Sequence, residues 1–238
     1  MNARAANIGS SRVEPGLKFS HARIFNSGAN GGTDADRLRI APTEMKSIPS
    51  QRRPNNRLTV VVVDYDPAWV ETFEQLRTRI WPVVCDVATT IEHIGSTAVP
   101  GLAAKAIVDI SVVVPTPAHV PMAIERLVSL GYLHQGNLGV EGREAFGAPT
   151  LLPAHHLYLC PSNSLALRNH LAVRDYLRAH PDIADEYGAL KKQLAARFTH
   201  DIDGYIDGKT DTILGILRMA GFQSEELEKI ARVNRRSV

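Results

Sequence analysis

Apolar side chains recur every third or fourth residue after a Tyr-Asp-Pro turn, and this spacing forms one apolar face on an α-helix. Pro67 follows Asp66 and suits the first turn of a helix, because its ring fixes φ and its missing N–H is not needed there. We therefore predict a helix from about residue 68 to residue 83. Its buried face consists of Trp69, Phe73, Leu76, Ile80 and Val84.

The pattern then changes to that of β-strands. Residues 90–94 form a short run that ends at Gly95, and residues 107–114 are nearly all β-branched except for Asp109 and Ser111. Charged side chains are rarely buried unless they are paired or bound to a metal, so Asp109 in such a strand needs an explanation. Further strands are expected at residues 58–63, near Tyr132, near Phe146 and at residues 156–160.

Helices dominate the rest of the chain. Residues 117–130 are predicted to be helical and to stop at Gly131, and three more helices are expected at residues 165–179, 182–199 and 209–219. Strands first and helices later are typical of an α+β domain, here with a mixed sheet and a helical C-terminal part. We assign residues 58–222 to this domain and residues 223–238 to an exposed helical or frayed tail.

The small net charge of +2 conceals an uneven distribution. Residues 1–57 hold 10 Lys or Arg against 4 Asp or Glu and are rich in Gly, Ser, Asn and Pro, which predicts a basic, disordered extension. A transit peptide, or sequence upstream of the true start of the domain, is the alternative for this segment. The remainder holds 17 Lys or Arg against 21 Asp or Glu, which argues against broad binding to nucleic acid.

No apolar run approaches the ~20 residues that span a bilayer, so no membrane role is expected and a cytoplasmic location is the prediction. Cys85 and Cys160 lie far apart and form no metal-type pair, so we interpret both as reduced core thiols.

Several motifs together resemble one known family. They are YDPAW from Tyr65, HIGSTAVPGLAAKAIVDI from His93, GREAF from Gly142, HHLYL from His155, RDYLRAHP from Arg174, and the region of Tyr205 and Lys209. This set is similar to the GrpB family of the nucleotidyltransferase superfamily and covers roughly residues 58–222. The resemblance implies a nucleotidyltransferase-like mixed sheet with flanking helices.

The superfamily pattern is a Gly-Ser turn, a spacer, and then two carboxylates on one strand. Gly95-Ser96 and Asp109 fit this pattern, but Ser111 stands where the second carboxylate is expected. The resemblance implies that Asp109 is a catalytic residue and a ligand of Mg²⁺, with Mn²⁺ as the alternative. A single carboxylate leaves three possibilities: one weakly held metal, His156 as a substitute ligand or base, or loss of transfer chemistry.

The turn after Gly95 is a candidate phosphate site. Ser96 and Thr97 offer hydroxyls and backbone N–H groups to an anion, although a plain turn with a helix cap has the same sequence. Lys105 lies between the turn and the Asp109 strand, where its ammonium either contacts a phosphate or is simply solvated.

Histidines supply candidate bases. On a strand, residues two apart share a face, so His156 and Tyr158 point the same way while His155 points to the other side. Because its strand is expected to pair near Asp109, His156 is a second catalytic candidate, as ligand or general base, and His93 is a weaker one.

Basic residues in loops and helices complete the set. Arg143 is a candidate for bidentate phosphate or carboxylate binding, with a surface ion pair to Glu141 or Glu144 as the alternative. Two Tyr-Lys pairs lie four residues apart on predicted helices: Tyr187 with Lys191, and Tyr205 with Lys209 if that helix continues through Gly208. Surface helices often contain such pairs, but the family resemblance favours Lys209 as a phosphate ligand. Arg174 and Asp175 are expected to orient a helix.

The leading hypothesis is a protein that binds a nucleotide or a related phosphorylated metabolite and transfers a nucleotidyl group to a small-molecule hydroxyl or amine. The alternative is a non-catalytic partner or binding module for nucleotides or coenzyme A precursors, because domains of this family also occur fused to dephospho-CoA kinase. An RNA-linked role driven by the basic extension is the least favoured hypothesis.

Overall fold

The computed structural model describes residues 59–235, so the disorder predicted for residues 1–57 lies outside the described part of the chain. A five-stranded mixed sheet has the order β1-β2-β5-β4-β3. The strands are β1 (Thr90–Ile94), β2 (Val108–Val114), β3 (Leu133–His134), β4 (Glu144–Gly147) and β5 (His155–Pro161). β2 is antiparallel to β1 and parallel to β5, whereas β4 is antiparallel to both of its neighbours.

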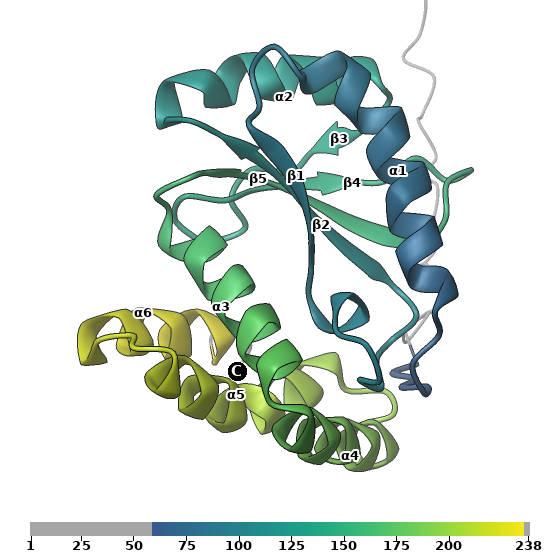
Figure 1. Cartoon of the computed structure of the whole chain (residues 1–238), viewed down its shortest axis with the longest axis vertical. Helices are drawn as coiled ribbons and strands as arrows, with labels where there is room; N and C mark the ends of the chain where they lie inside the picture. The colour runs from purple at the N-terminus through teal and green to yellow at the C-terminus, as the bar shows by residue number, and fades with distance from the viewer. Residues whose placement is uncertain (1–58, 236–238) are drawn as a thin grey trace, which may run out of the picture. The chain divides into compact units, whose positions relative to one another are not determined.

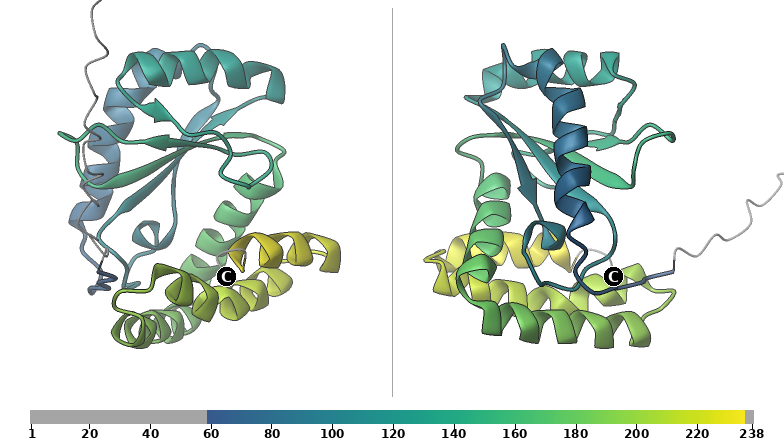
Figure 2. Two further views of the ribbon diagram at one scale, coloured as in Figure 1. Left: turned by 180° about the vertical axis from the view of Figure 1, so that it is seen from behind. Right: turned by 45° about the vertical axis from the view of Figure 1, so that its right-hand side comes forward.

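Two helices cover one face of the sheet, as Figures 1 and 2 show. They are α1 (Ala68–Val84) and α2 (Val120–Ser129), the latter preceded by a short 3-10 turn at Pro117–His119. The predicted apolar face of α1 is confirmed, since all five of its residues are buried. They pack against Ile110 and Leu157, which are fully buried in the sheet, and form the main core.

The other face of the sheet meets α3 (Leu165–Ala179), and the chain then builds a helical layer below it (Figure 1). This layer consists of α4 (Pro181–Arg197), α5 (Ile202–Met219) and α6 (Ser224–Asn234). α5 begins seven residues earlier than Lys209, the predicted start, because the Asp201 carboxylate accepts a hydrogen bond from the N–H of Gly204 and caps it there.

Three local predictions are wrong. Residues 59–63 form only one bridge, between Val63 and Ala104, and Val60 instead packs on the helical layer. The predicted helix in the tail is confirmed by α6, but its full exposure is wrong, because α6 buries Leu227 and Ile230 against Leu217 and Phe222. Cys85 is exposed because it lies just beyond the end of α1, whereas Cys160 is buried as predicted.

Within the described residues, no helix is long and apolar enough to cross a membrane.

Candidate functional site

Gly95 and Asp109 form the floor of the site, where β1 ends beside β2. The antiparallel register places Ile94 opposite Asp109, and Gly95 then turns the chain into η1 (Ser96–Ala98), a short 3-10 helix. Gly95 has φ 70° and ψ −171°, a conformation that favours glycine. A Cβ on Gly95 would overlap Oδ2 of Asp109 and lie 2.9 Å from its Cγ. The glycine therefore allows the turn to approach the carboxylate.

His156 is the partner of Asp109. The parallel register of β2 and β5 pairs these residues, and Nδ1 of His156 lies 2.8 Å from Oδ1 of Asp109. The predicted proximity is confirmed, and the partner of Asp109 is neither an arginine nor a backbone N–H. An Nδ1–H that donates to the carboxylate leaves Nε2 as the free acceptor of the neutral ring.

His93 and His155 face the opposite side of the sheet. Nε2 of His93 lies 3.0 Å from Oγ1 of Thr97, and its ring stacks on Phe73. Burial lowers the pKa of His93 to about 4, so this histidine is neutral and structural. Thr97 is 1% exposed and its hydroxyl is bonded to His93, so the predicted phosphate role would fall to its backbone N–H.

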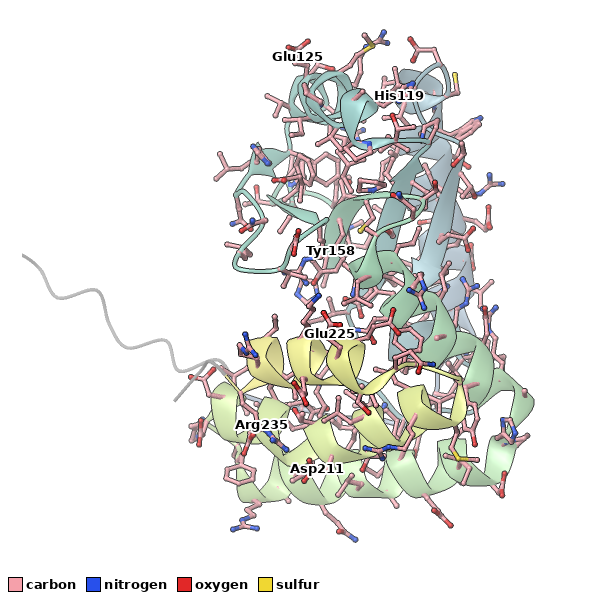
Figure 3. All side chains as sticks on the ribbon, turned by 90° about the vertical axis from the view of Figure 1, so that its left-hand side faces the viewer. His119, Glu125, Tyr158, Asp211, Glu225 and Arg235 are labelled. Carbon is pink, nitrogen blue, oxygen red and sulfur yellow. The ribbon has the colours of Figure 1, made fainter. Side chains whose placement is uncertain are left out.

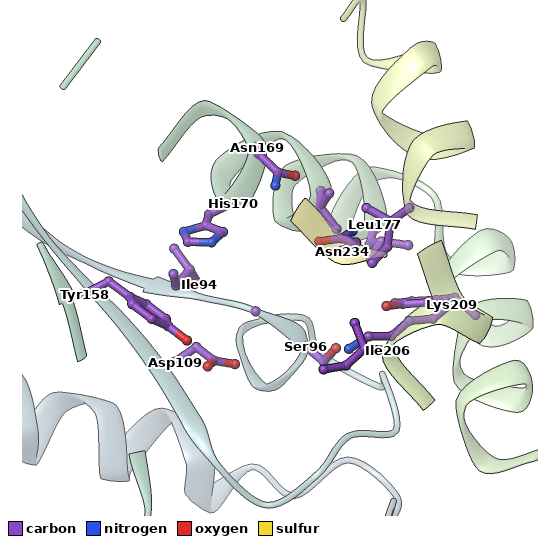
Figure 4. A pocket seen from close by; sticks show the side chains of 14 residues that line it. Ile94, Ser96, Asp109, Tyr158, Asn169, His170, Leu177, Ile206, Lys209 and Asn234 are labelled. Atoms are coloured by element: carbon purple, nitrogen blue, oxygen red, sulfur yellow. The ribbon is translucent and has the colours of Figure 1, made fainter. Parts of the chain in front are cut away.

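Two lysines reach the Gly-Ser turn from the helical layer. Nζ of Lys191, on α4, donates a hydrogen bond of 2.8 Å to Oγ of Ser96, and the side chain is 2% exposed. Nζ of Lys209, on α5, lies 4.9 Å from the centre of the Tyr205 ring, and Figure 4 shows its side chain extending toward Ser96. Neither lysine forms an ion pair with a carboxylate among the described residues.

Burial controls the protonation of both lysines. Burial, together with the charge of Lys209, lowers the pKa of Lys191 to about 7. Burial, together with the charge of Lys105, lowers the pKa of Lys209 to about 8. Asp109 acts in the opposite direction on each of them. Two cationic groups that lack a carboxylate partner suit an anionic ligand.

A cavity of about 290 Å³ lies between the sheet, α3 and the helical layer (Figure 4). Its lining includes Gly95, Ser96, Asp109, Tyr158, His170 and Lys209. Lys191 and His156 are not part of its lining but bond to two residues that are, Ser96 and Asp109. Of the eight predicted site residues, four line the cavity, namely Gly95, Ser96, Asp109 and Lys209, and His156 adjoins it through Asp109. Lys105 is not part of the lining, although its charge acts on Lys209.

Arg143 lies to one side of this cavity. Its guanidinium carbon is 4.7 Å from the centre of the Tyr158 ring, and the side chain lines a second, neighbouring cavity. The alternative of a surface ion pair is wrong, since Arg143 forms none within residues 59–235. The predicted orienting role of Arg174 is supported by its contacts: its guanidinium bonds both Asp175 and Glu92, and so fastens α3 to β1.

Sequence reasoning gave too little weight to two residues. In the sequence Lys191 forms a Tyr-Lys pair of a common kind with Tyr187, and only its burial and its bond to Ser96 distinguish it. His170, on α3, was not singled out at all. No motif contains His170, and the periodicity of its helix predicts the helix but not a functional residue.

Asp109 is the single carboxylate at the floor of the site, and this decides how a metal ion would fit. Oδ1 is bonded to His156, which leaves Oδ2 for a cation. Among the described residues, no three His, Cys, Asp or Glu side chains cluster as a metal site, and Ser111 is fully buried. The donor set fits an Mg²⁺ ion that takes most of its ligands from substrate phosphates and water, but not an ion held by protein alone.

The two lysines predict an unusual dependence of stability on pH. Their pKa values are near 7 and 8 in the folded protein and about 10.4 in an unfolded chain. Between about pH 7 and pH 9 the unfolded chain therefore binds more protons, so the free energy of unfolding increases with pH. Urea titrations across this range measure the slope. We expect the slope to be smaller in Lys191→Met and unchanged in the control Lys192→Met, because Lys192 is exposed and pairs with Asp64. Equal slopes in the two variants would contradict the lowered pKa of Lys191.

A glycine turn packed on a strand carboxylate, in a mixed sheet with a helical C-terminal part, defines the site of this α+β domain. The family model described as GrpB protein matches residues 59–219, and the chain belongs to the GrpB family. The family and the α+β class predicted from the sequence, with a mixed sheet and a helical C-terminal part, are therefore confirmed.

Individual relatives agree with this assignment. The UPF0157 protein YqkA of Bacillus subtilis is 38% identical over 154 residues, which are 65% of this chain and 45% of YqkA. The chain thus spans less than half the length of that relative. The crystal structure of conserved protein GrpB from Enterococcus faecalis is 36% identical, has a TM-score of 0.60, and is matched over 71% of this chain and 98% of that one.

Two further matches are more distant. A dephospho-CoA kinase of Mycolicibacterium paratuberculosis is 26% identical over 63% of this chain and 43% of its own length. The Cid1 poly(U) polymerase with bound MgGTP is 17% identical, with a TM-score of 0.41 over 57% of this chain and 45% of that chain.

Proposed function

We propose that the cavity beside Asp109 binds a nucleoside triphosphate by its phosphates and that the protein transfers the nucleotidyl group to a small-molecule acceptor. One observation carries this proposal: a strand carboxylate, the buried Lys191 and the partly buried Lys209 meet at a Gly-Ser turn, and neither lysine forms an ion pair within residues 59–235. Buried cations without partners are costly, and the phosphate oxygens of a ligand would offset that cost.

Each residue then has a role in the proposed reaction. Lys191 and Lys209 hold the phosphates through charge, and Ser96 orients Lys191. The acceptor hydroxyl oxygen forms a bond to the α-phosphorus, the bond from that phosphorus to the bridging oxygen breaks, and pyrophosphate leaves. The hydroxyl proton passes to Nε2 of His156, which Asp109 keeps in the required tautomer.

Mg²⁺, or Mn²⁺ in its place, would be held by Asp109 and the phosphates, and would supply neutralisation of the charge that develops on them. The single carboxylate also allows the second candidate, a non-catalytic module that binds nucleotides or coenzyme A precursors. Its support is the missing second carboxylate at Ser111 and the similarity to part of a dephospho-CoA kinase. A cytoplasmic location remains part of this proposal, and two free cysteines are compatible with it.

Thermal unfolding with ligands tests both candidates. ATP, GTP, CTP, UTP and dephospho-CoA are each added with Mg²⁺, Mn²⁺ or EDTA, and a ligand at ~100 times its Kd stabilises the fold by about 2.7 kcal/mol. A metal-dependent shift with a triphosphate, lost in Lys209→Gln and retained in the control Lys192→Gln, is the expected result. A shift of the melting temperature that is the same with EDTA as with Mg²⁺ favours the binding module. The absence of any shift with the four triphosphates would overturn nucleotide binding.

A further inference from the structure

A second cavity of about 550 Å³ opens next to the first, between the loop before β4, the start of α3, and α6. Asn169, His170 and Asn234 line both cavities, so the two are neighbours with a common wall. Figure 3 shows Tyr158 on the sheet, opposite the yellow helix α6. The second cavity thus ends close to the residues that the reaction would use.

The charge of this second cavity is positive. Arg143, Lys229 and Arg232 line it, against one carboxylate, Glu141. Lys229 is paired with Glu225 at 2.9 Å, but neither Arg143 nor Arg232 forms an ion pair in the part of the chain that the structure describes. Two arginines are therefore available to an anion from opposite sides, one on the loop and one on α6.

Two polar atoms near the common wall lack partners. Nε of Arg143 and Nδ1 of His170 are both buried, and neither has a hydrogen-bond partner among the described residues. An arginine Nε–H can only donate, and a buried donor without an acceptor is destabilising. The guanidinium of Arg143 lies over the Tyr158 ring, and this contact restrains the orientation of the guanidinium. The arginine is thus fixed in position but lacks an acceptor.

We propose that the second cavity binds the acceptor of the transfer reaction, and that this acceptor is a small anion with a phosphate-monoester or carboxylate head held by Arg143. This inference rests on the proposed function, since it names the second substrate of the same site. The guanidinium fork matches the two oxygens of such a head. Val140, Ile230 and Val233 give the cavity an apolar side that accommodates a short carbon skeleton.

The position of the head determines where the reactive group lies. With the anion on Arg143, the rest of a small molecule extends along Asn169 and His170 into the first cavity, because these residues line both. A hydroxyl at that end meets the side of the cavity lined by Tyr158 and Asp109, and His156 is bonded to Asp109 there. The two substrates therefore occupy adjoining cavities and bind at the same time.

Binding of matched probes tests this arrangement. The probes are glycerol 3-phosphate and glycerate, each at about 10 mM or below, with glycerol as the uncharged counterpart, and calorimetry measures the Kd. We expect an anionic probe to bind and glycerol not to bind. Arg143→Gln is expected to weaken binding of the anionic probe about 10- to 100-fold. Arg143→Lys is expected to weaken it as well, because lysine keeps the charge but lacks the two parallel N–H donors of the guanidinium. Arg79→Gln, on the exposed surface of α1, is the control and leaves the Kd unchanged.

A parallel titration with ATP separates this inference from the proposed function. Lys209→Gln is expected to weaken binding of ATP and to change the Kd of the anionic probe by no more than about twofold. Arg143→Gln is expected to weaken binding of the probe and to leave the Kd of ATP nearly unchanged. Saturating ATP should not displace the probe. Failure of ATP to bind, with the probe still dependent on Arg143, would contradict the proposed function and the acceptor role, and would leave only anion binding in the second cavity. Competition between ATP and the probe, equal affinity in Arg143→Gln, or no binding of either anionic probe would overturn the second cavity as the acceptor site.

Discussion

Replacement of Asp109 by asparagine is expected to reduce nucleotidyl transfer by at least about a thousandfold while the protein remains folded. An amide keeps the shape of the carboxylate, but it lacks the negative charge that would hold a metal ion at Oδ2. It also no longer selects the Nδ1–H tautomer of His156. In serine proteases, the equivalent change in an Asp-His pair costs about 10⁴ in rate. Asp109 is expected to serve both as a metal ligand and as the partner of the base, so the loss combines both effects.

Release of pyrophosphate from a radiolabelled triphosphate measures this loss, and the melting temperature shows that the variant is folded. Asp64→Asn is the matched control, because Asp64 is 87% exposed and lies outside the cavity lining. His156→Gln should give a smaller loss, since it removes the base but leaves Oδ2 in place. Turnover in Asp109→Asn at the wild-type rate would rule out both roles of the aspartate.

Replacement of Gly95 by alanine should destabilise the fold by about 3 kcal/mol, the largest stability effect that we expect from a single methyl group. The backbone has φ 70° and ψ −171°, which costs a side chain about 1–3 kcal/mol. The new Cβ would also overlap the carboxylate of Asp109, and overpacking of this kind costs about 1–3 kcal/mol. Urea unfolding measures the sum.

Gly101 provides a matched control. It has φ 80°, yet a Cβ added there meets no atom within 4 Å, so Gly101→Ala reports backbone strain alone, about 1–2 kcal/mol. The double variant Gly95→Ala/Asp109→Ala should recover part of the loss, because it removes the overlapping carboxylate. If Gly95→Ala costs no more than Gly101→Ala, the close approach between the turn and Asp109 is wrong.

Local patterns predicted much of the fold. The apolar face of α1, the β2 strand and the span of α3 follow from side-chain periodicity and from turn residues, which act over a few positions. The segment at residues 59–63 has the composition of a strand but packs on helices, because strand pairing depends on available sheet edges rather than on composition. The burial of α6 likewise depends on distant partners.

The site was predicted only in part for the same reason. Gly95, Ser96 and Asp109 lie close in sequence and carried a recognisable spacing, and the Asp109-His156 pair followed from strand reasoning. Lys191 meets Ser96 through the docking of α4, and no local signal encodes that contact. The position of Arg143 in a second cavity also depends on tertiary packing, because Tyr158 and α6 are distant from it in sequence and surround its side chain.

The two halves of the site differ in when they are made. β1, η1 and β2 precede α4 and α5 along the chain, so a growing polypeptide acquires its carboxylate well before the lysines. Both halves line the cavity, so it exists only after the helical layer has packed against the sheet. A chain that ended before α5 would keep the Gly95 turn beside Asp109, but it would lack Lys209 and the wall that encloses the site.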